Sequence, residues 1–368
     1  MREALERSLL GDRVTTAVFL LLLAFGTLMV RSATFGTRYA ALGERQILYA
    51  GIALAVFALA SLVPYSIWFE YGYLLYAGSL VALLVVLVAG RTIAGSRSWL
   101  YLGPIGFQPS ELAKAAAAVA CATVIRDLPD KGLEGRQVAL LWGIVALPMV
   151  LTLLQPDFGT ATTFLPIAAA VLYFARFPLA RILKWGGFVL VGVLLLFALG
   201  WFTFLKPYQK DRILTFLDPA HDPRGAGYQV AQARIAVGSG ELWGKGLFSG
   251  TQNRMNFLPA PHTDFIFGVV AEETGFLGST GILGAFLLLL GRFLSTLRVA
   301  RDAEGRFLVL AVFALLVYHL LVNVGMVLGL LPTTGIPLPF LSYGGSFLVS
   351  TSFLVGLAGN VRSRRYLG

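Results

Sequence analysis

The chain has 368 residues, of which 57% are hydrophobic and 13% are charged, and its mean hydropathy is +0.77. These values describe a polytopic membrane protein rather than a soluble one, with room for about ten spans of roughly 20 residues each. The net charge is +10. Because the basic residues are dispersed along predicted helix ends, nucleic-acid binding is a poor explanation of the charge.

The predicted fold is an all-α bundle of about ten transmembrane helices, in one domain over residues 1–368. The first apolar run lacks a small-residue cleavage site and leads into further spans, so we interpret it as a retained helix. The predicted spans, in chain order, are 14–30, 46–63, 71–89, 111–126, 138–155, 160–175, 186–205, 265–291, 307–330 and 341–360.

Basic residues indicate the orientation of the bundle. Arginines and lysines mark both termini and the connections 126–136, 176–184 and 292–306, all on the same side of a ten-span protein. The positive-inside rule makes that side the cytoplasm, with both termini inside. The basic connection between Arg31 and Arg45 contradicts this assignment, but the basic residues at both termini and in the other three connections outweigh it.

Three predicted connections on the outer side are distinctive. They are the Gly-rich segment 91–109, the tight turn 155–159 and the large segment 206–263 between helices 7 and 8. The large segment mixes aromatic and basic residues, and residues 228–237 can form a short helix that the sequence Gly-Ser-Gly at 238–240 would stop. We expect interfacial helices there, as a lid or crevice wall in the headgroup layer.

A second irregular stretch lies near the C-terminus. Three prolines within residues 332–339 exclude a continuous helix, and such backbone survives at membrane depth only where protein or a water-filled cavity satisfies it. The small residues of 341–346 then allow close helix contact. The one cysteine, Cys121, lies in an Ala-rich span and is expected to serve packing.

Asp264 and His262 stand at the mouth of the apolar run 265–290. Ionisable groups at a membrane boundary are costly and occur mostly where they handle ions, protons or polar substrates. The alternative is that Asp264 only caps the helix behind it. Residues from other segments favour a role in a chemical reaction over a capping role.

Glu111 and Lys114 share a helix face because they are three residues apart. They form either an internal ion pair or a site where Lys114 meets a phosphate and Glu111 holds it. Ser110 and Glu111 after Pro109 are also typical of a helix start. Asp157, in the turn 155–159, is expected to cap the helix that begins near Thr160.

Arg97 and Trp99 lie in the segment before that helix. A guanidinium suits phosphate oxygens, and a Trp suits either sugar stacking or anchoring at the membrane interface. Together with Asp264 as a base, these cations suit transfer of a sugar from a lipid pyrophosphate.

Deeper polar residues are expected to have structural roles. Glu272 and Glu273 point about 100° apart on a helix, so they cannot both face one cavity equally well, and hydrogen bonds to neighbouring helices are the structural role expected of them. His319 and Asn323, four residues apart, are expected to join helices rather than bind metal. No HExxH, CxxC or P-loop pattern occurs, so zinc and nucleotide hydrolysis have no support.

Six segments together resemble the SEDS family (shape, elongation, division and sporulation) of bacterial membrane proteins, in the family's order over nearly the whole chain. Gly244-Lys245-Gly246 and Gly250-Thr251-Gln252 resemble its elongation branch (RodA) rather than its division branch (FtsW). The six are Gly-Ser-Arg-Ser-Trp-Leu at 95–100, Gln-Pro-Ser-Glu-Leu-Ala-Lys at 108–114, Gln-Pro-Asp-Phe-Gly-Thr at 155–160, Gly-Ala-Gly-Tyr-Gln at 225–229, His-Thr-Asp-Phe-Ile-Phe at 262–267 and the run 323–346.

The resemblance implies a peptidoglycan glycosyltransferase of the bacterial inner membrane that polymerises lipid II, the undecaprenyl-pyrophosphate-linked disaccharide pentapeptide, beside a class B penicillin-binding protein. Asp264 would be the general base for the acceptor hydroxyl, and undecaprenyl pyrophosphate would leave with inversion. Lys114, Arg97 and Arg212 would stabilise the leaving charge, Glu111 would orient Lys114, and Trp99 and His262 would contact substrate.

The sequence departs from the family at Ala260, Thr274 and Phe347, which removes none of these groups. A divalent cation, Mg²⁺ or Mn²⁺, suits pyrophosphate chemistry, but no ligand set is visible.

Two other functions stay open. A lipid II flippase would need polar groups accessible from both sides of the membrane, and a scaffold that only recruits wall enzymes would tolerate Asp264→Asn.

Overall fold

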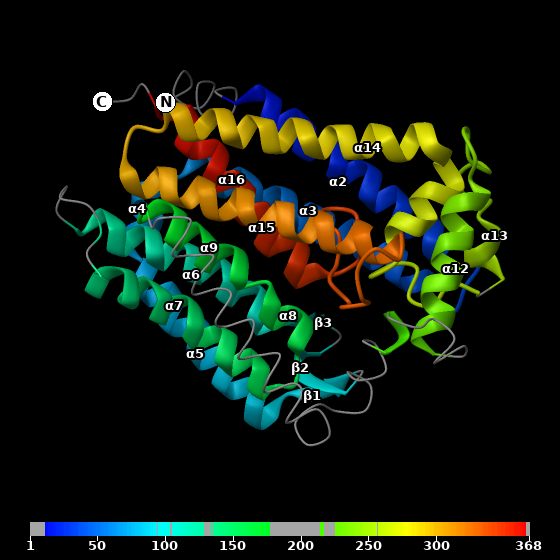
Figure 1. Cartoon of the computed structure of the whole chain (residues 1–368), viewed down its shortest axis with the longest axis horizontal. Coiled ribbons are helices and arrows are strands. Elements are labelled where there is room, and N and C mark those ends of the chain that lie inside the picture. Colours follow the sequence, from blue (N-terminus) through cyan, green and yellow to red (C-terminus); the bar gives the residue numbers. More distant parts are fainter. Residues whose placement is uncertain are drawn as a thin grey trace.

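The computed structural model describes residues 12–93, 95–103, 105–128, 133, 135–176, 214–216, 225–255 and 257–365. It is a bundle of helices in which the two termini lie at one end and a small sheet lies towards the other (Figure 1). Six helices are long and apolar enough to cross a membrane. They are α2 (Arg13–Thr34), α3 (Ala40–Leu62), α5 (Gly72–Ala89), α7 (Gly135–Leu154), α14 (Ile266–Val299) and α15 (Ala303–Val327).

The remaining helices complete the predicted bundle. Each predicted span except 186–205 overlaps a helix, and that range lies outside the described residues, as does much of 206–263. The chain is a polytopic, mostly helical membrane protein, as predicted. The other helices are α4 (Tyr65–Glu70), α6 (Pro109–Arg126), α8 (Phe158–Thr162), α9 (Leu165–Phe174), α12 (Ala226–Ser239), α13 (Thr251–Arg254) and α16 (Gly345–Ser363).

The centre of the bundle is the Ala-rich helix α6, which is buried almost along its whole length. Its small side chains let neighbouring helices approach, and Cys121 packs there with no exposed surface. Helices α3 and α16 also pack closely through glycines. A Cβ at Gly356 would lie 2.8 Å from the Phe57 carbonyl oxygen, and one at Gly345 would lie 2.8 Å from the Tyr49 ring. The predicted close contact of the small residues at 341–346 is confirmed for Gly345.

The segment 91–109 is not a plain loop. It forms an antiparallel sheet of β1 (Arg91–Ile93), β2 (Ser96–Leu102) and β3 (Ile105–Phe107) in the order β1-β2-β3. The turns between the strands contain Gly95 and Gly103, whose φ angles of 84° and 64° favour glycine. The all-α expectation therefore missed a short sheet, because its strands are too short for an alternating pattern to stand out.

Helix α14 bends at Gly275, which has φ 67° and ψ −165° inside the helix. A Cβ at this position would lie 2.3 Å from the Gly244 backbone nitrogen, so only glycine fits. The bend admits the segment between α12 and α13. The predicted continuous span 265–291 is thus two helical pieces in one longer element.

The two adjacent carboxylates before this bend fix that segment. Glu272 pairs with Lys245 at 2.7 Å and accepts the Thr251 backbone N–H at 2.8 Å. Glu273 accepts the Ser32 hydroxyl at 2.7 Å and the Phe248 N–H at 3.2 Å. The prediction that hydrogen bonding explains both residues is confirmed, with the segment before α14 as the main partner.

Asn360 joins α16 to the end of α3, and its replacement by Leu is expected to destabilise the bundle. The fully buried Nδ2 atom lies 2.9, 2.8 and 2.6 Å from the carbonyl oxygens of Ala60, Ser61 and Val63. Leu would leave these carbonyls without that donor, at about 1–3 kcal/mol per buried unsatisfied group. Thermal unfolding in detergent measures the loss, and an unchanged midpoint would contradict this role.

Candidate functional site

Asp264 lies in the turn that enters α14, and its side chain is half-buried. The N-cap residue of the helix is Phe265 and no side-chain cap forms there, so Asp264 is not the N-cap residue. A Cβ at Gly335 would lie 3.4 Å from the Asp264 Oδ2 atom. The carboxylate therefore lies against the backbone of the irregular stretch 331–340, which has the non-helical conformation that its prolines predict.

Two residues of α15 hold that stretch against the Asp264 turn. The buried Asn323 Nδ2 atom donates to the Asp264 carbonyl oxygen at 2.9 Å and to the Ile336 carbonyl oxygen at 2.8 Å. The His319 Nδ1 atom lies 3.1 Å from the Pro337 carbonyl oxygen. The sequence predicts that these two residues join helices. They instead join α15 to the non-helical stretch 331–340 and to the turn before α14.

A serine adds a further connection. The Ser342 hydroxyl accepts the Leu338 N–H and donates to the Thr263 carbonyl oxygen, both at 2.7 Å. The Tyr343 N–H donates to the His262 carbonyl oxygen at 2.7 Å. Hydrogen bonds from Asn323, Ser342 and Tyr343 therefore fix the backbone around Asp264.

Glu111 and Lys114 form the predicted ion pair in the first turns of α6. The Lys114 Nζ atom lies 2.8 Å from Glu111 Oε2, and each residue is 3% exposed. The helix begins at Pro109, as predicted. The Ser350 hydroxyl donates to the Glu111 carbonyl oxygen at 2.7 Å, and Lys114 lies 5.5 Å from the centre of the Phe347 ring.

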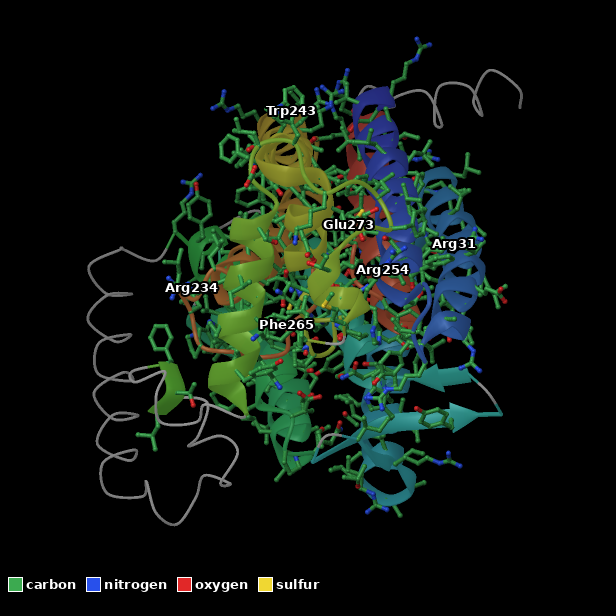
Figure 2. The ribbon with its side chains drawn as sticks, turned by 90° about the vertical axis from the view of Figure 1, so that its right-hand side faces the viewer. Arg31, Arg234, Trp243, Arg254, Phe265 and Glu273 are labelled. Atoms are coloured by element: carbon green, nitrogen blue, oxygen red, sulfur yellow. The ribbon has the colours of Figure 1, made fainter. Side chains whose placement is uncertain are left out.

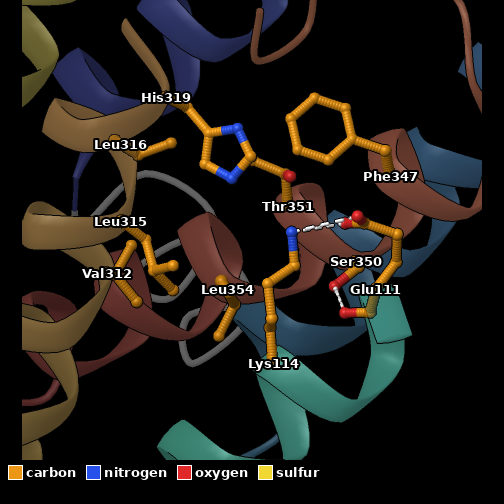
Figure 3. Close-up of a pocket in the computed structure, with 10 residues that line it drawn as sticks. All are labelled: Glu111, Lys114, Val312, Leu315, Leu316, His319, Phe347, Ser350, Thr351 and Leu354. Carbon is orange, nitrogen blue, oxygen red and sulfur yellow. Dashed lines mark hydrogen bonds and ion pairs between the residues drawn. The ribbon is translucent and has the colours of Figure 1, made fainter. Parts of the chain in front are cut away.

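The pair lines a cavity of about 20 Å³ between α6, α15 and α16, room for about one water molecule. Figure 3 shows Lys114 pointing towards Glu111, with the rings of His319 and Phe347 closing one side. Because His319 also contacts Pro337, the irregular stretch 331–340 touches both Asp264 and the wall of this cavity. The remaining lining residues are Val312, Leu315, Leu316, Ser350, Thr351 and Leu354.

Arg97 and Trp99 both lie on β2. The Arg97 guanidinium donates to the Gly90 carbonyl oxygen at 2.8 Å and to the Val88 carbonyl oxygen at 2.6 Å, so it covers the end of α5. Trp99 is half-buried, with its ring over Gly106. Arg212 lies outside the described residues.

His262 lies between two tyrosine rings and is only 8% exposed. Its ring centre is 4.9 Å from that of Tyr39 and 5.8 Å from that of Tyr343, and its Nδ1 atom has no hydrogen-bond partner among the described residues. Burial lowers the pKa of His262 to about 4. The imidazole is therefore neutral at pH 7 and supplies no positive charge.

The folded protein is expected to lose stability below pH 6.5 because of His262. The unfolded chain binds a proton near pH 6.5 and the folded chain only near pH 4, so between these values the unfolded state gains up to about 1.4 kcal/mol per pH unit. His262→Phe keeps an aromatic ring and removes this titration. Chemical unfolding at pH 7 and pH 5 measures the difference, and equal pH dependence in both proteins would refute the assignment.

The structure also confirms two smaller predictions from the sequence. Asp157 is the N-cap of α8, and its carboxylate accepts the Thr160 N–H at 3.1 Å. Helix α12 covers the predicted helix 228–237 and ends at Ser239. Among the described residues, no group of three His, Cys, Asp or Glu side chains could hold a metal ion.

The fold and this site define a polytopic membrane protein with fixed ionisable groups at one end of a helical bundle. The family model described as "Cell cycle protein" (FTSW_RODA_SPOVE) matches residues 12–367. The chain therefore belongs to this family, the SEDS proteins, as its sequence segments indicate.

Relatives and solved structures agree with this membership. The chain is 34% identical over 355 residues to the peptidoglycan glycosyltransferase MrdB of Escherichia coli (strain K12), covering 96% of this chain and 94% of the relative. It is 38% identical over 365 residues to the probable peptidoglycan glycosyltransferase FtsW of Geobacter sp. (strain M18), covering 96% and 97%. Relatives from both branches match at similar identity.

Two solved structures share the fold. A chain from a peptidoglycan synthase complex that coordinates polymerization and crosslinking superimposes with a TM-score of 0.80 at 33% identity, covering 96% of this chain and 98% of that one. The rod shape determining protein RodA of Thermus thermophilus superimposes with a TM-score of 0.68 at 30% identity, covering 96% of each chain.

Proposed function

We propose that this protein is a peptidoglycan glycosyltransferase that polymerises lipid II, with Asp264 as its general base. The observation that carries the proposal is the fixed position of the Asp264 turn, which Asn323 and Ser342 hold from α15 and from the stretch before α16. Family membership supports the reaction class, because relatives from both branches are named glycosyltransferases.

In the proposed reaction, Asp264 accepts the proton of the acceptor's GlcNAc 4-hydroxyl while that oxygen attacks C1 of the donor's MurNAc. The new glycosidic bond forms with inversion as the bond to undecaprenyl pyrophosphate breaks. A positioned carboxylate contributes about 10²–10⁴-fold to such a step. Lys114 reaches the leaving group only when its pair with Glu111 opens, since both are buried.

Trp99, half-buried on β2, is proposed to stack on a sugar or lipid. His262 contributes as a neutral ring beside Asp264, and Arg97 and Arg212 stay candidates for the pyrophosphate. The partner is proposed to be a class B penicillin-binding protein, because a similar chain occurs in a synthase complex that crosslinks peptidoglycan. We place the protein in the bacterial inner membrane, with its termini cytoplasmic and Asp264 outward, and in the elongation branch.

The test supplies lipid II to one side of vesicles that contain the purified protein, with and without a class B penicillin-binding protein. Products are resolved by size. Long glycan strands support the polymerase. Lipid II that crosses the membrane unpolymerised would support the flippase instead and would overturn the proposal.

A further inference from the structure

Exposed arginines without an ion pair among the described residues occur at both ends of the bundle; Arg136 and Arg298 are examples near the termini. Four of them lie on the ends of α2 and α13 and around the start of α3. These four, the arginine cluster, are Arg31, Arg38, Arg45 and Arg254.

Two members of the arginine cluster lie against the tyrosines that flank His262. The Arg38 guanidinium lies 4.9 Å from the centre of the Tyr39 ring, which contacts His262. Arg45 interacts with Tyr343, whose ring contacts His262 on another side. One tyrosine ring therefore separates each arginine from His262, which is two residues before the proposed base.

The other two members lie on neighbouring elements. Helix α13 rests on the end of α2, where the Asn253 Nδ2 atom lies 3.5 Å from the Ser32 carbonyl oxygen. This contact brings Arg254 of α13 near Arg31 of α2. Figure 2 labels Arg31 and Arg254 in the same view as the buried Phe265, the residue after Asp264.

Two of the three cations first predicted to meet a pyrophosphate are already engaged, and the third, Arg212, lies outside the described residues. Lys114 is buried in its pair with Glu111, and the Arg97 guanidinium covers the end of α5. The arginine cluster has no carboxylate partner among the described residues, and Arg38 and Arg45 contact only tyrosine side chains there. It also explains why the basic segment between Arg31 and Arg45 violates the positive-inside rule, since a function that needs cations on this side outweighs the orientation signal.

We propose that the arginine cluster binds the pyrophosphate of a polyprenyl-linked sugar substrate and so holds the lipid beside Asp264. The inference rests on the proposed function for the identity of the substrate. Guanidinium groups suit a pyrophosphate because their planar forks donate paired hydrogen bonds to its oxygens. A cluster of four without carboxylate partners matches a ligand that carries several negative charges.

The test compares Arg38→Gln/Arg45→Gln with the control Arg136→Gln/Arg298→Gln, which removes the same charge from exposed arginines on α7 and α14. Lipid II binding and polymerisation are measured in phosphatidylcholine vesicles. We expect Kd and KM for lipid II to rise at least about tenfold in the first variant, equivalent to about 1.4 kcal/mol. The kcat should stay close to wild type, and the control should keep wild-type values.

Two further measurements distinguish binding of a pyrophosphate from binding of anionic lipid headgroups. Inorganic pyrophosphate should inhibit the wild type and the control more strongly than Arg38→Gln/Arg45→Gln. Vesicles with added phosphatidylglycerol should leave lipid II binding to the wild type nearly unchanged. Unchanged Kd in the variant, or equal competition by phosphatidylglycerol, would overturn the inference. Arginine-dependent binding of lipid II without glycan synthesis would refute the proposed function and leave this inference standing.

Discussion

Replacing Asp264 with Asn is expected to reduce polymerisation of lipid II at least about 100-fold, because the amide cannot accept the proton of the attacking hydroxyl. The side chain keeps its size, and the turn keeps its main attachments. Asn323 donates to the backbone oxygen of Asp264, and Ser342 donates to that of Thr263. The loss should therefore appear in kcat, with thermal unfolding and binding to the penicillin-binding protein unchanged.

Asp127→Asn is the matched control. Asp127 follows the C-terminal end of α6, whereas Glu111 and Lys114 lie at its N-terminal end, and it pairs with Arg126 on the surface. This variant should polymerise at the wild-type rate. Glycan synthesis by Asp264→Asn at near-normal rate would show that Asp264 is not the base and would favour a scaffold.

The sequence predicts helices and key residues better than it predicts their contacts. Hydrophobic runs locate the spans because each must cross an apolar layer of fixed thickness. The bend at Gly275 was not foreseeable, since it depends on the Gly244 backbone that packs against it from a distant segment. The orientation of Arg97 is also a tertiary property, because the carbonyls of α5 compete with any ligand for its guanidinium.

In the candidate site too, the sequence predicts some features but not the contacts that surround them. Spacing predicts that Glu111 and Lys114 share a helix face, because they are three residues apart, and it leaves open whether they pair or whether Lys114 meets a phosphate. It does not predict that α15 and α16 bury the pair, nor that Asn323 holds the Asp264 turn. The basic segment between Arg31 and Arg45 contradicts the expected orientation, and the sequence alone gives no reason for it. Only the structure shows that Tyr39, within this segment, packs against His262.

The second large effect concerns the buried pair of α6. Lys114→Met and Glu111→Gln are each expected to lower the free energy of unfolding by about 3–5 kcal/mol, because each leaves the other charge buried without its partner. The double variant removes both charges and keeps similar volumes, so it should recover most of that stability. Chemical unfolding in mixed micelles measures all three variants against the wild type.

Measurements of kcat distinguish a purely structural role of Lys114 from a direct role in the reaction. We expect Lys114→Met to lower kcat more than Glu111→Gln does, because a mobile cation can follow the leaving pyrophosphate whereas Glu111 only holds it. The stable double variant should then remain slow, with KM for lipid II near wild type because the arginine cluster is intact. Wild-type kcat in the double variant would mean that the pair only supports the fold, and a larger loss in Glu111→Gln would assign the chemistry to Glu111.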